Sequence, residues 1–501
     1  MDMQGPPPPA DSWAPPAVVT PPDRPGGRRR GRLVALVVAA VLVVVLGAGG
    51  LVYALVGRSG GHSYPSHWDA RIAPIAHEVE KLRGLKFEHP VPVDFLSDAK
   101  FRKLVTTDDK DLSASDRRDL QRSEGLLRAL GLIGRDVDLL SATNTLQGSD
   151  VLAFYDNDTK RVSVRGQRLD VDTRVTLAHE LTHALQDQHF DLTKLQDQAD
   201  RDNRQLPLTA LVEGDAVRIE DAYVNTLSEA DQQAYDASQN ADSSSVQQQT
   251  DDVPGIVVAL QQTPYALGPT MLETFKALHG GGAIDDAFRD PPRTDLDVLA
   301  PILGDDLGGA RHVATPALRA GERRDGAPDT FGAAGLYFTL ASRMPAADAL
   351  RAADGWAGDS MIEFRRGDEL CVRAAFRGRD ASATTAIADG LRRWAGAMPA
   401  GMATVDTNGG LVTLSSCDAG TPVPTAKTFA DDALTMVGTR NELAATFVEQ
   451  SSVPGGVAQC VADGVVARPD LYAEVQKNED NPPQSFVDAV RGIATTCRAS
   501  T

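Results

Sequence analysis

The sequence predicts an α+β fold: a single transmembrane helix, a mostly helical domain with a β-hairpin, a small α/β module and a C-terminal helical module. Three observations support this prediction. An apolar run without charged residues occupies 33–57. Helical periodicity between residues 70 and 343 is interrupted by two short β-type runs, 151–155 and 161–165. Strand-type runs then cluster between 361 and 415, and helical periodicity returns after 428.

The N-terminus has the composition of a membrane anchor. Residues 1–32 hold nine of the 30 Pro and five Arg, and they form a predicted cytoplasmic tail. A helix over 33–57 would be about 36 Å long, which exceeds a bilayer core of about 30 Å. Because the Arg cluster precedes it, we expect a single-pass plasma-membrane protein with its C-terminal domain extracytoplasmic. The alternative is a cleaved signal peptide and a secreted protein.

The domain over 58–330 is predicted from its periodicity to be mostly helical, with one hairpin. The two hairpin strands flank the turn-like residues 156–160. Residues 237–252 are polar and poor in apolar side chains, which predicts a mobile insertion. The expected helices are 70–85, one starting at 98, 112–132, 172–189, 208–227 and 271–278, and a further strand is expected over 90–96.

The rest of the chain divides into two cysteine-containing modules, an α+β module over 331–425 and a helical module over 426–501. Four cysteines without C-x-x-C spacing agree with an oxidising compartment. Pairing chain neighbours predicts the disulfides Cys371–Cys417 and Cys460–Cys497. The elements expected in the first module are helices 331–343 and 381–397 and strands 361–365, 370–376, 402–405 and 411–415.

Composition and charge exclude several classes of protein. The chain has 501 residues, of which 42% are hydrophobic and 24% charged, so wholesale disorder, collagen and a polytopic membrane protein are excluded. The formal net charge of −19 argues against a nucleic-acid partner. No feature of the sequence indicates an oligomeric state.

The chemistry is concentrated in one motif, H-E-x-x-H, which occupies residues 179–183 inside a predicted helix. On a helix, His179 and His183 lie one turn apart and about 40° apart in azimuth, so their imidazoles converge on one ion. Glu180 is rotated by about 100° from His179, where its carboxylate can reach a water on that ion without ligating it. A catalytic zinc ion takes three protein ligands and keeps one open position, so the sequence must supply a third ligand.

Two residues are candidates for the third ligand. His189 has the spacing of the metzincin pattern, but Gln186 stands where that pattern has the Gly that permits a turn. On an unbroken helix His189 would lie about 9 Å and about 120° from His183. Glu213 lies in an otherwise apolar helical stretch, where a carboxylate is costly unless it is paired or bound to a metal.

Here the chain resembles the gluzincin group of zincin metallopeptidases, through HELTH at 179–183 and VEGDA at 212–216, within about residues 150–225. The resemblance implies a zincin-like domain over 58–330, with zinc at His179, His183 and Glu213 and with Glu180 as general base. The pattern departs at Val217, where an Asp that orients a ligand histidine is expected. Asp187 and Asp215 are the candidates to replace that Asp.

The predicted function is a membrane-anchored extracytoplasmic zinc metalloendopeptidase that hydrolyses protein or peptide substrates. The hairpin strand 161–165 is expected to pair with an extended peptide. Tyr265 is the first candidate to stabilise the oxyanion, and we expect it just before a helix. The other candidates are Tyr155, Tyr223, His279 and His312. The alternative function is a catalytically silent ectodomain of the same fold, used for peptide binding or envelope scaffolding.

Overall fold

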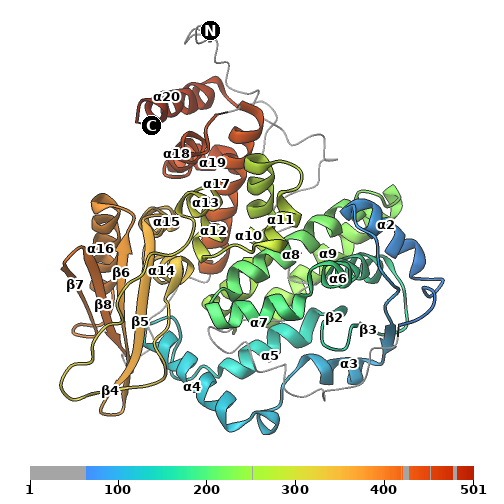
Figure 1. The fold of residues 1–501 in the computed structure, drawn as a ribbon, viewed down its shortest axis with the longest axis horizontal. Helices are drawn as coiled ribbons and strands as arrows, with labels where there is room; N and C mark the ends of the chain where they lie inside the picture. The colour runs from blue at the N-terminus through green and yellow to red at the C-terminus, as the bar shows by residue number, and fades with distance from the viewer. Residues whose placement is uncertain are drawn as a thin grey trace, which may run out of the picture.

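The computed structural model describes residues 64–250, 252–418, 420, 428–451, 453–477 and 482–500. They form a helix-rich α+β fold with two sheets, as predicted. Figure 1 shows the two sheets on opposite sides of the molecule, with α8 (Gln205–Val224) and α10 (Gly255–His279) between them. The predicted tail 1–32 and transmembrane segment 33–57 lie outside the described residues. Among the described helices, none is long and apolar enough to cross a membrane.

The first sheet has three strands in the order β1-β3-β2. Strand β1 is parallel to β3, and β2 is antiparallel to it. The elements up to residue 250 are α2 (Ala73–Arg83), β1 (Val93–Leu96), α3 (Asp98–Val105), the 3₁₀ helix η3 (Asp109–Asp111), α4 (Ala114–Ala129), α5 (Leu139–Asp150), β2 (Ala153–Asp156), β3 (Arg161–Arg165), α6 (Val171–Phe190), α7 (Leu192–Asp202), α8 (Gln205–Val224) and α9 (Glu229–Thr250).

The hairpin forms as predicted, but its edge strand is β2 and not the strand over 161–165. Strand β3 lies in the middle of the sheet because β1 pairs with its other side. The side chains of Val162 and Val164 are fully buried in a core shared with α2 and α6. Pairing of β1 with β3 joins residues almost 70 positions apart, so the periodicity of the sequence does not reveal it.

The second sheet is antiparallel, with five strands in the order β4-β5-β6-β8-β7, and it contains all four predicted strands. Helix α16 packs against β6, β7 and β8. The elements of this region are α10 (Gly255–His279), α11 (Ala283–Arg289), α12 (Asp295–Leu299), α13 (Pro301–Leu307), β4 (Glu322–Arg324), α14 (Gly332–Ala341), α15 (Ala346–Ala353), β5 (Trp356–Arg366), β6 (Glu369–Gly378), α16 (Ala381–Gly396), β7 (Ala403–Asn408) and β8 (Leu411–Cys417).

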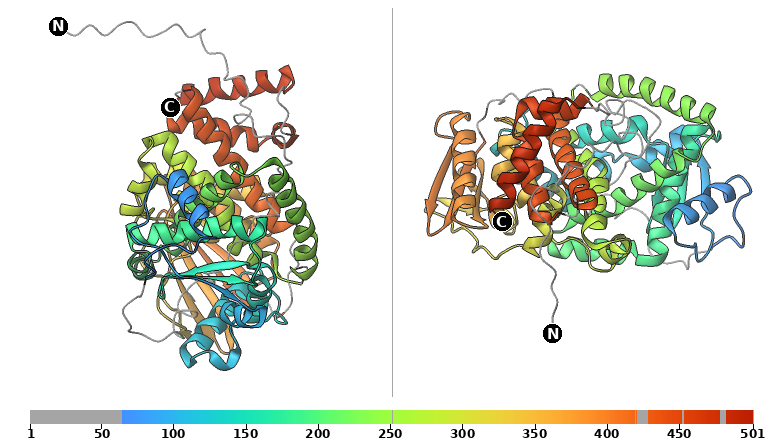
Figure 2. Two further views of the ribbon diagram at one scale, coloured as in Figure 1. Left: turned by 90° about the vertical axis from the view of Figure 1, so that its right-hand side faces the viewer. Right: turned by 90° about the horizontal axis from the view of Figure 1, so that it is seen from above.

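The C-terminal part is helical, as predicted, and both disulfides join the predicted partners. Cys371 of β6 faces Cys417 of β8 in the sheet register, and Cys460–Cys497 joins α18 to α20. Figure 2 shows the last helices stacked at one end of the molecule. They are α17 (Phe429–Ser451), α18 (Gly455–Val466), α19 (Pro469–Lys477) and α20 (Gln484–Ser500).

The structure differs from the sequence predictions at two helices, of which α9 was not expected and α10 is longer than expected. The polar residues expected as an insertion, 237–252, continue α9 to Thr250. Helix α10 begins at Gly255 and includes Pro264 and Pro269, so Tyr265 lies inside a helix and not before one. A proline within a helix removes one backbone hydrogen bond and disfavours the helix locally, yet tertiary packing can outweigh that cost. Both faces of α10 supply buried residues, which provides such packing.

Candidate metal centre

Helix α6 carries the motif in the predicted geometry. It begins at Asp170, whose side chain accepts a hydrogen bond from the backbone N–H of Thr173, and it runs without a break to Phe190. The rings of His179 and His183 therefore lie on one face, with their centroids 4.7 Å apart. The face is buried: His179 is fully enclosed, whereas 12% of the His183 side chain remains exposed.

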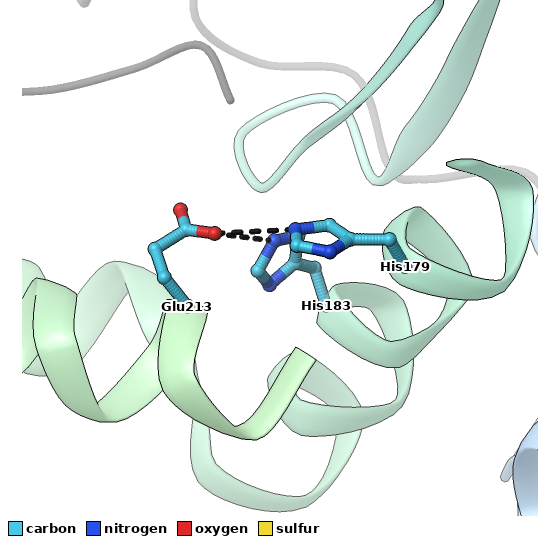
Figure 3. Close-up of side chains that lie close together, drawn as sticks. All are labelled: His179, His183 and Glu213. Carbon is cyan, nitrogen blue, oxygen red and sulfur yellow. Dashed lines mark hydrogen bonds and ion pairs between the residues drawn. The ribbon is translucent and has the colours of Figure 1, made fainter. Parts of the chain in front are cut away.

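Helix α8 brings Glu213 to these two imidazoles (Figure 3). The Oε2 atom of Glu213 lies 3.2 Å from Nε2 of His179 and 3.2 Å from Nε2 of His183. One potential ligand atom from each of the three residues lies within 4.8 Å of the other two. We call His179, His183 and Glu213 the candidate metal centre. Two imidazole nitrogens and one carboxylate oxygen form a donor set suited to a divalent ion such as zinc.

The three groups of the candidate metal centre control one another's ionisation. Burial alone would raise the pKa of Glu213, but the imidazoles of His183 and His179 lower it to about 2. Burial opposes protonation of His179, yet Glu213 and Glu220 hold its pKa well above the usual value. The pKa of His183 is also raised, because Glu213 outweighs the effect of burial. The Glu213 carboxylate is therefore ionised, and a cation bound at this centre would displace protons from the two imidazoles.

Glu220, which the sequence analysis missed, supports His179 from the side opposite Glu213. Its Oε2 lies 2.8 Å from Nδ1 of His179, and its Oε1 accepts a hydrogen bond of 3.2 Å from the hydroxyl of Tyr235 in α9. A carboxylate on the second ring nitrogen fixes the tautomer of a metal-binding histidine. The sequence holds one indication of this contact. Glu220 follows Glu213 by seven residues, which is two helical turns, so both carboxylates lie on one face of α8.

The two residues proposed to replace the missing Asp have other contacts. Asp187 accepts hydrogen bonds from the hydroxyl of Tyr155 (2.6 Å) and from Nζ of Lys160 (2.7 Å), which ties α6 to the hairpin. Asp215 contacts Gln186, which in turn contacts His183. Val217, at the position where that Asp was expected, packs against Tyr265.

Glu180 lies between the candidate metal centre and the edge strand β2. Its Oε2 accepts a hydrogen bond of 2.7 Å from the backbone N–H of Tyr155. That N–H points away from β3, because Leu152 is hydrogen-bonded to Arg165 and alternate residues of β2 face the free edge. Burial raises the pKa of the Glu180 carboxyl to about 7.

Tyr265 reaches the candidate metal centre from α10. Its ring lies 6.4 Å from that of His179, centroid to centroid, and only 5% of the residue is exposed. Burial and the neighbouring Glu213 carboxylate raise the pKa of its hydroxyl well above the usual value, so the hydroxyl keeps its proton.

Two glycines allow α10 to approach α8 this closely. A Cβ on Gly214 would lie 2.4 Å from the backbone carbon of Gly268, and a Cβ on Gly268 would lie 2.2 Å from the carbonyl oxygen of Ala210. The two helices therefore cross backbone to backbone, one residue away from Glu213 and three from Tyr265.

The other predicted candidates lie elsewhere. His189 is exposed, and its Nε2 donates a hydrogen bond of 2.8 Å to the carbonyl of Lys86, because α6 does not turn after His183. His279 contacts Asp305 at the end of α10, and His312 is exposed. Tyr223 is buried in the core beneath the first sheet. Tyr155 contributes its backbone N–H to Glu180, while its hydroxyl is bound to Asp187.

Comparisons with protein-family models, with curated proteins and with solved structures found no match for this chain.

Proposed function

We propose that the protein is a zinc metalloendopeptidase. The observation that carries this proposal is the convergence of His179, His183 and Glu213, with the Glu180 carboxylate held beside them on the side of an edge strand. The order of a hairpin, a helix with H-E-x-x-H and a helix with the third ligand supports the resemblance to gluzincins. A carboxylate next to the ligands has a use in catalysis and none in simple peptide binding.

His179, His183 and Glu213 would hold the zinc ion. When bound, zinc acts as a Lewis acid that activates a water molecule and polarises a peptide carbonyl. Glu180 would accept the proton of that water and pass it to the leaving amine. The hydrogen bond from the Tyr155 N–H orients the carboxylate for this task. The Tyr265 hydroxyl, protonated and directed at the same centre, would stabilise the oxyanion.

The free edge of β2 would bind the substrate. Ala153 directs its backbone groups and Tyr155 its carbonyl toward this edge, where an extended peptide can add as a further strand, while the Tyr155 N–H is donated to Glu180. The proposed substrate is therefore a protein or peptide in an extended conformation. The apolar run over 33–57 would anchor the enzyme in the plasma membrane with this site outside the cell, and the two disulfides agree with that location.

A test of this function uses the full-length chain in detergent and the variant Glu180→Gln. We expect about one zinc per chain in both proteins, and cleavage of a peptide library by the wild type only. The variant should be slower by about 100-fold or more, because it lacks the general base. Absence of zinc in the wild type, or undiminished cleavage by Glu180→Gln, would contradict the proposal. Zinc binding without any cleavage by the wild type would favour the catalytically silent ectodomain.

A further inference from the structure

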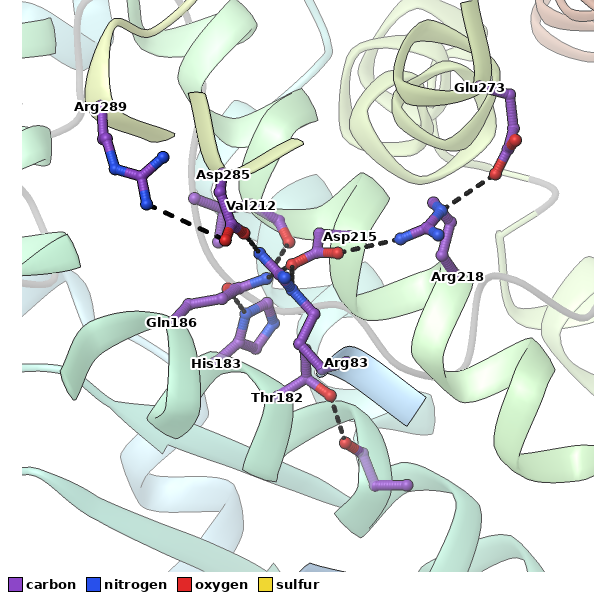
Figure 4. Close-up of polar contacts among 11 residues, drawn as sticks. Arg83, Thr182, His183, Gln186, Val212, Asp215, Arg218, Glu273, Asp285 and Arg289 are labelled. Carbon is purple, nitrogen blue, oxygen red and sulfur yellow. Dashed lines mark hydrogen bonds and ion pairs between the residues drawn. The ribbon is translucent and has the colours of Figure 1, made fainter. Parts of the chain in front are cut away.

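Gln186 stands one turn after His183 and contacts its imidazole. The amide oxygen Oε1 lies 3.0 Å from Nδ1 of His183, the ring nitrogen that faces away from Glu213 (Figure 4). Because an amide has both a hydrogen-bond acceptor and a donor, this distance alone does not show whether His183 donates to Gln186 or accepts from it. The surroundings of the amide nitrogen decide between them.

The amide of Gln186 has one possible orientation. Its Nε2 lies 3.0 Å from the carbonyl oxygen of Val212 and 3.1 Å from Oδ2 of Asp215. Both of these atoms only accept hydrogen bonds, so the –NH₂ group must face them. The oxygen therefore faces His183 and requires a proton on Nδ1. In the neutral imidazole that binds a metal, Nε2 of His183 then keeps its lone pair, directed toward the candidate metal centre.

Asp215 is in turn held by two arginines. Nε of Arg83, from α2, donates to Asp215 at 2.6 Å, and Nη1 of Arg218 donates at 3.1 Å. Arg83 also donates to Asp285 of α11 at 2.6 Å. The Asp215 side chain is fully buried and that of Arg83 is 7% exposed, so solvent does not compete for these contacts. Figure 4 shows the chain of contacts from Arg83 through Asp215 and Gln186 to His183.

We propose that Arg83, Asp215 and Gln186 form a positioning relay that fixes the tautomer and ring orientation of His183 and so sets the metal affinity of the site. The inference rests on the proposed function, because it takes His183 as a metal ligand. The two imidazoles are then supported differently: His179 by the carboxylate of Glu220 directly, and His183 by a neutral amide whose orientation a buried ion pair maintains. The relay also makes metal affinity depend on how α2 and α11 dock against α8.

The experiment measures zinc affinity by chelator competition, and the visible absorption spectrum of the cobalt(II) form, on full-length protein in detergent. We expect Gln186→Met to bind zinc about 10- to 100-fold more weakly than the wild type and to alter the cobalt spectrum. Gln188→Met is the matched control. Gln188 lies on the same helix but binds the backbone at Glu88 and His89, so its loss should leave affinity and spectrum unchanged.

A charge variant separates positioning from packing. Gln186→Glu keeps nearly the same side-chain volume but places an acceptor where the Gln186 amide donates to Asp215 and to the carbonyl of Val212, so we expect weakened zinc binding. Circular dichroism verifies that each variant is folded, and Gln186→Asn, too short to span both contacts, replaces Gln186→Met if that variant unfolds.

The outcomes distinguish the relay from the function on which it rests. Wild-type affinity in Gln186→Met or in Gln186→Glu would overturn the relay while zinc binding by the wild type still stands. If the wild type binds neither zinc nor cobalt, the metal site itself is refuted and the relay with it.

Discussion

Glu220 places a negative charge on Nδ1 of His179, whereas Nδ1 of His183 contacts the neutral amide of Gln186. A carboxylate behind a ligand histidine raises the basicity of the ligating nitrogen as well as orienting the ring. The Glu220 carboxylate is itself held by the hydroxyl of Tyr235, a residue of the polar helix α9. At this scale His179 is thus the more strongly supported of the two imidazoles.

We predict that Glu220→Ala lowers zinc affinity by about 10- to 100-fold, because His179 loses the acceptor that orients it. Tyr235→Phe removes one hydrogen bond to Glu220 and should have a smaller effect in the same direction. Exposed Glu229, at the start of α9, provides a control, since Glu229→Ala removes a carboxylate without touching the site. Chelator competition measures all three. Wild-type affinity in Glu220→Ala would show that packing alone orients His179.

At the scale of elements, the site depends on how α6, α8 and α10 cross. Helix α6 places His179, Glu180 and His183 by its own sequence spacing, whereas Glu213 reaches them through the packing of α8 against α6. Tyr265 reaches them through the contact of α10 with α8. That contact has no room for a side chain at Gly214 or Gly268. Packed helix axes are usually 8–10 Å apart, and small residues at the crossing allow the backbones themselves to touch.

We predict that Gly268→Ala destabilises the protein by about 1–3 kcal/mol, because the added Cβ would force α10 away from the carbonyl of Ala210. Gly438→Ala in α17 is the matched control, since its nearest neighbour is a Leu267 side-chain atom at 3.9 Å. That substitution should be neutral or stabilising by up to about 1 kcal/mol, as expected for alanine in a helix. Urea unfolding measures both. Equal effects of the two substitutions would contradict the close crossing.

At the scale of the whole molecule, the three segments predicted as separate units, 58–330, 331–425 and 426–501, share one hydrophobic core. This core includes Leu211 of α8, Phe376 of β6 and Val437 of α17. Buried Arg440 of α17 joins the same segments, because it donates to Asp354 after α15 and to the carbonyl of Leu299 in α12. Strand β4 lies before the predicted boundary at 331 but pairs with β5. The predicted modules are therefore in extensive contact.

Two carboxyl groups meet where α12 and α14 contact the second sheet. Asp359 accepts hydrogen bonds from the backbone N–H groups of Phe331 and Gly332 and from Nε1 of Trp356. Asp295 lies against the same Gly332, where a Cβ would be 2.1 Å from its Oδ2. Burial and the neighbouring Asp359 raise the pKa of Asp295 to about 7, and burial raises that of Asp359 to about 6.

These pKa shifts predict a stability that falls as the pH rises. An aspartate of the unfolded chain titrates at about pH 3.9, so between about pH 4 and 7 the folded protein holds protons that the unfolded chain has released. This contribution to the free energy of unfolding is complete at the acid end of that range and is lost as the pH rises through 6 and 7. We therefore expect a higher urea midpoint at pH 5 than at pH 8.

The variant Asp295→Asn tests whether Asp295 causes this pH dependence of stability, because asparagine resembles the protonated acid at every pH. The difference in urea midpoint between pH 5 and pH 8 should shrink in Asp295→Asn and stay unchanged in Asp290→Asn, which alters an exposed carboxylate nearby. Wild type and variants are compared under identical metal conditions, so the histidines contribute equally to each. If Asp295→Asn kept the wild-type pH dependence of the urea midpoint, groups other than Asp295 would be its cause.

The sequence by itself determined the local chemistry of this protein. Residues four apart on a helix must share a face, so His179 and His183 converge wherever the helix packs, and the strands of the second sheet follow from local alternation. Glu213 was predictable because a carboxylate in an apolar stretch needs a partner. The disulfides were predictable because neighbouring cysteines lay in the same predicted modules.

Only the tertiary structure decided which residues support that chemistry. Glu220, Gln186 and Tyr265 act through the crossing of α6, α8 and α10, and the edge strand depends on a parallel pairing of β1 with β3. The identity of a side chain does not specify its distant partner, since burial and hydrogen bonding depend on how elements far apart in the chain meet. Periodicity identifies the elements, whereas packing determines their neighbours and hence the surroundings of the candidate metal centre.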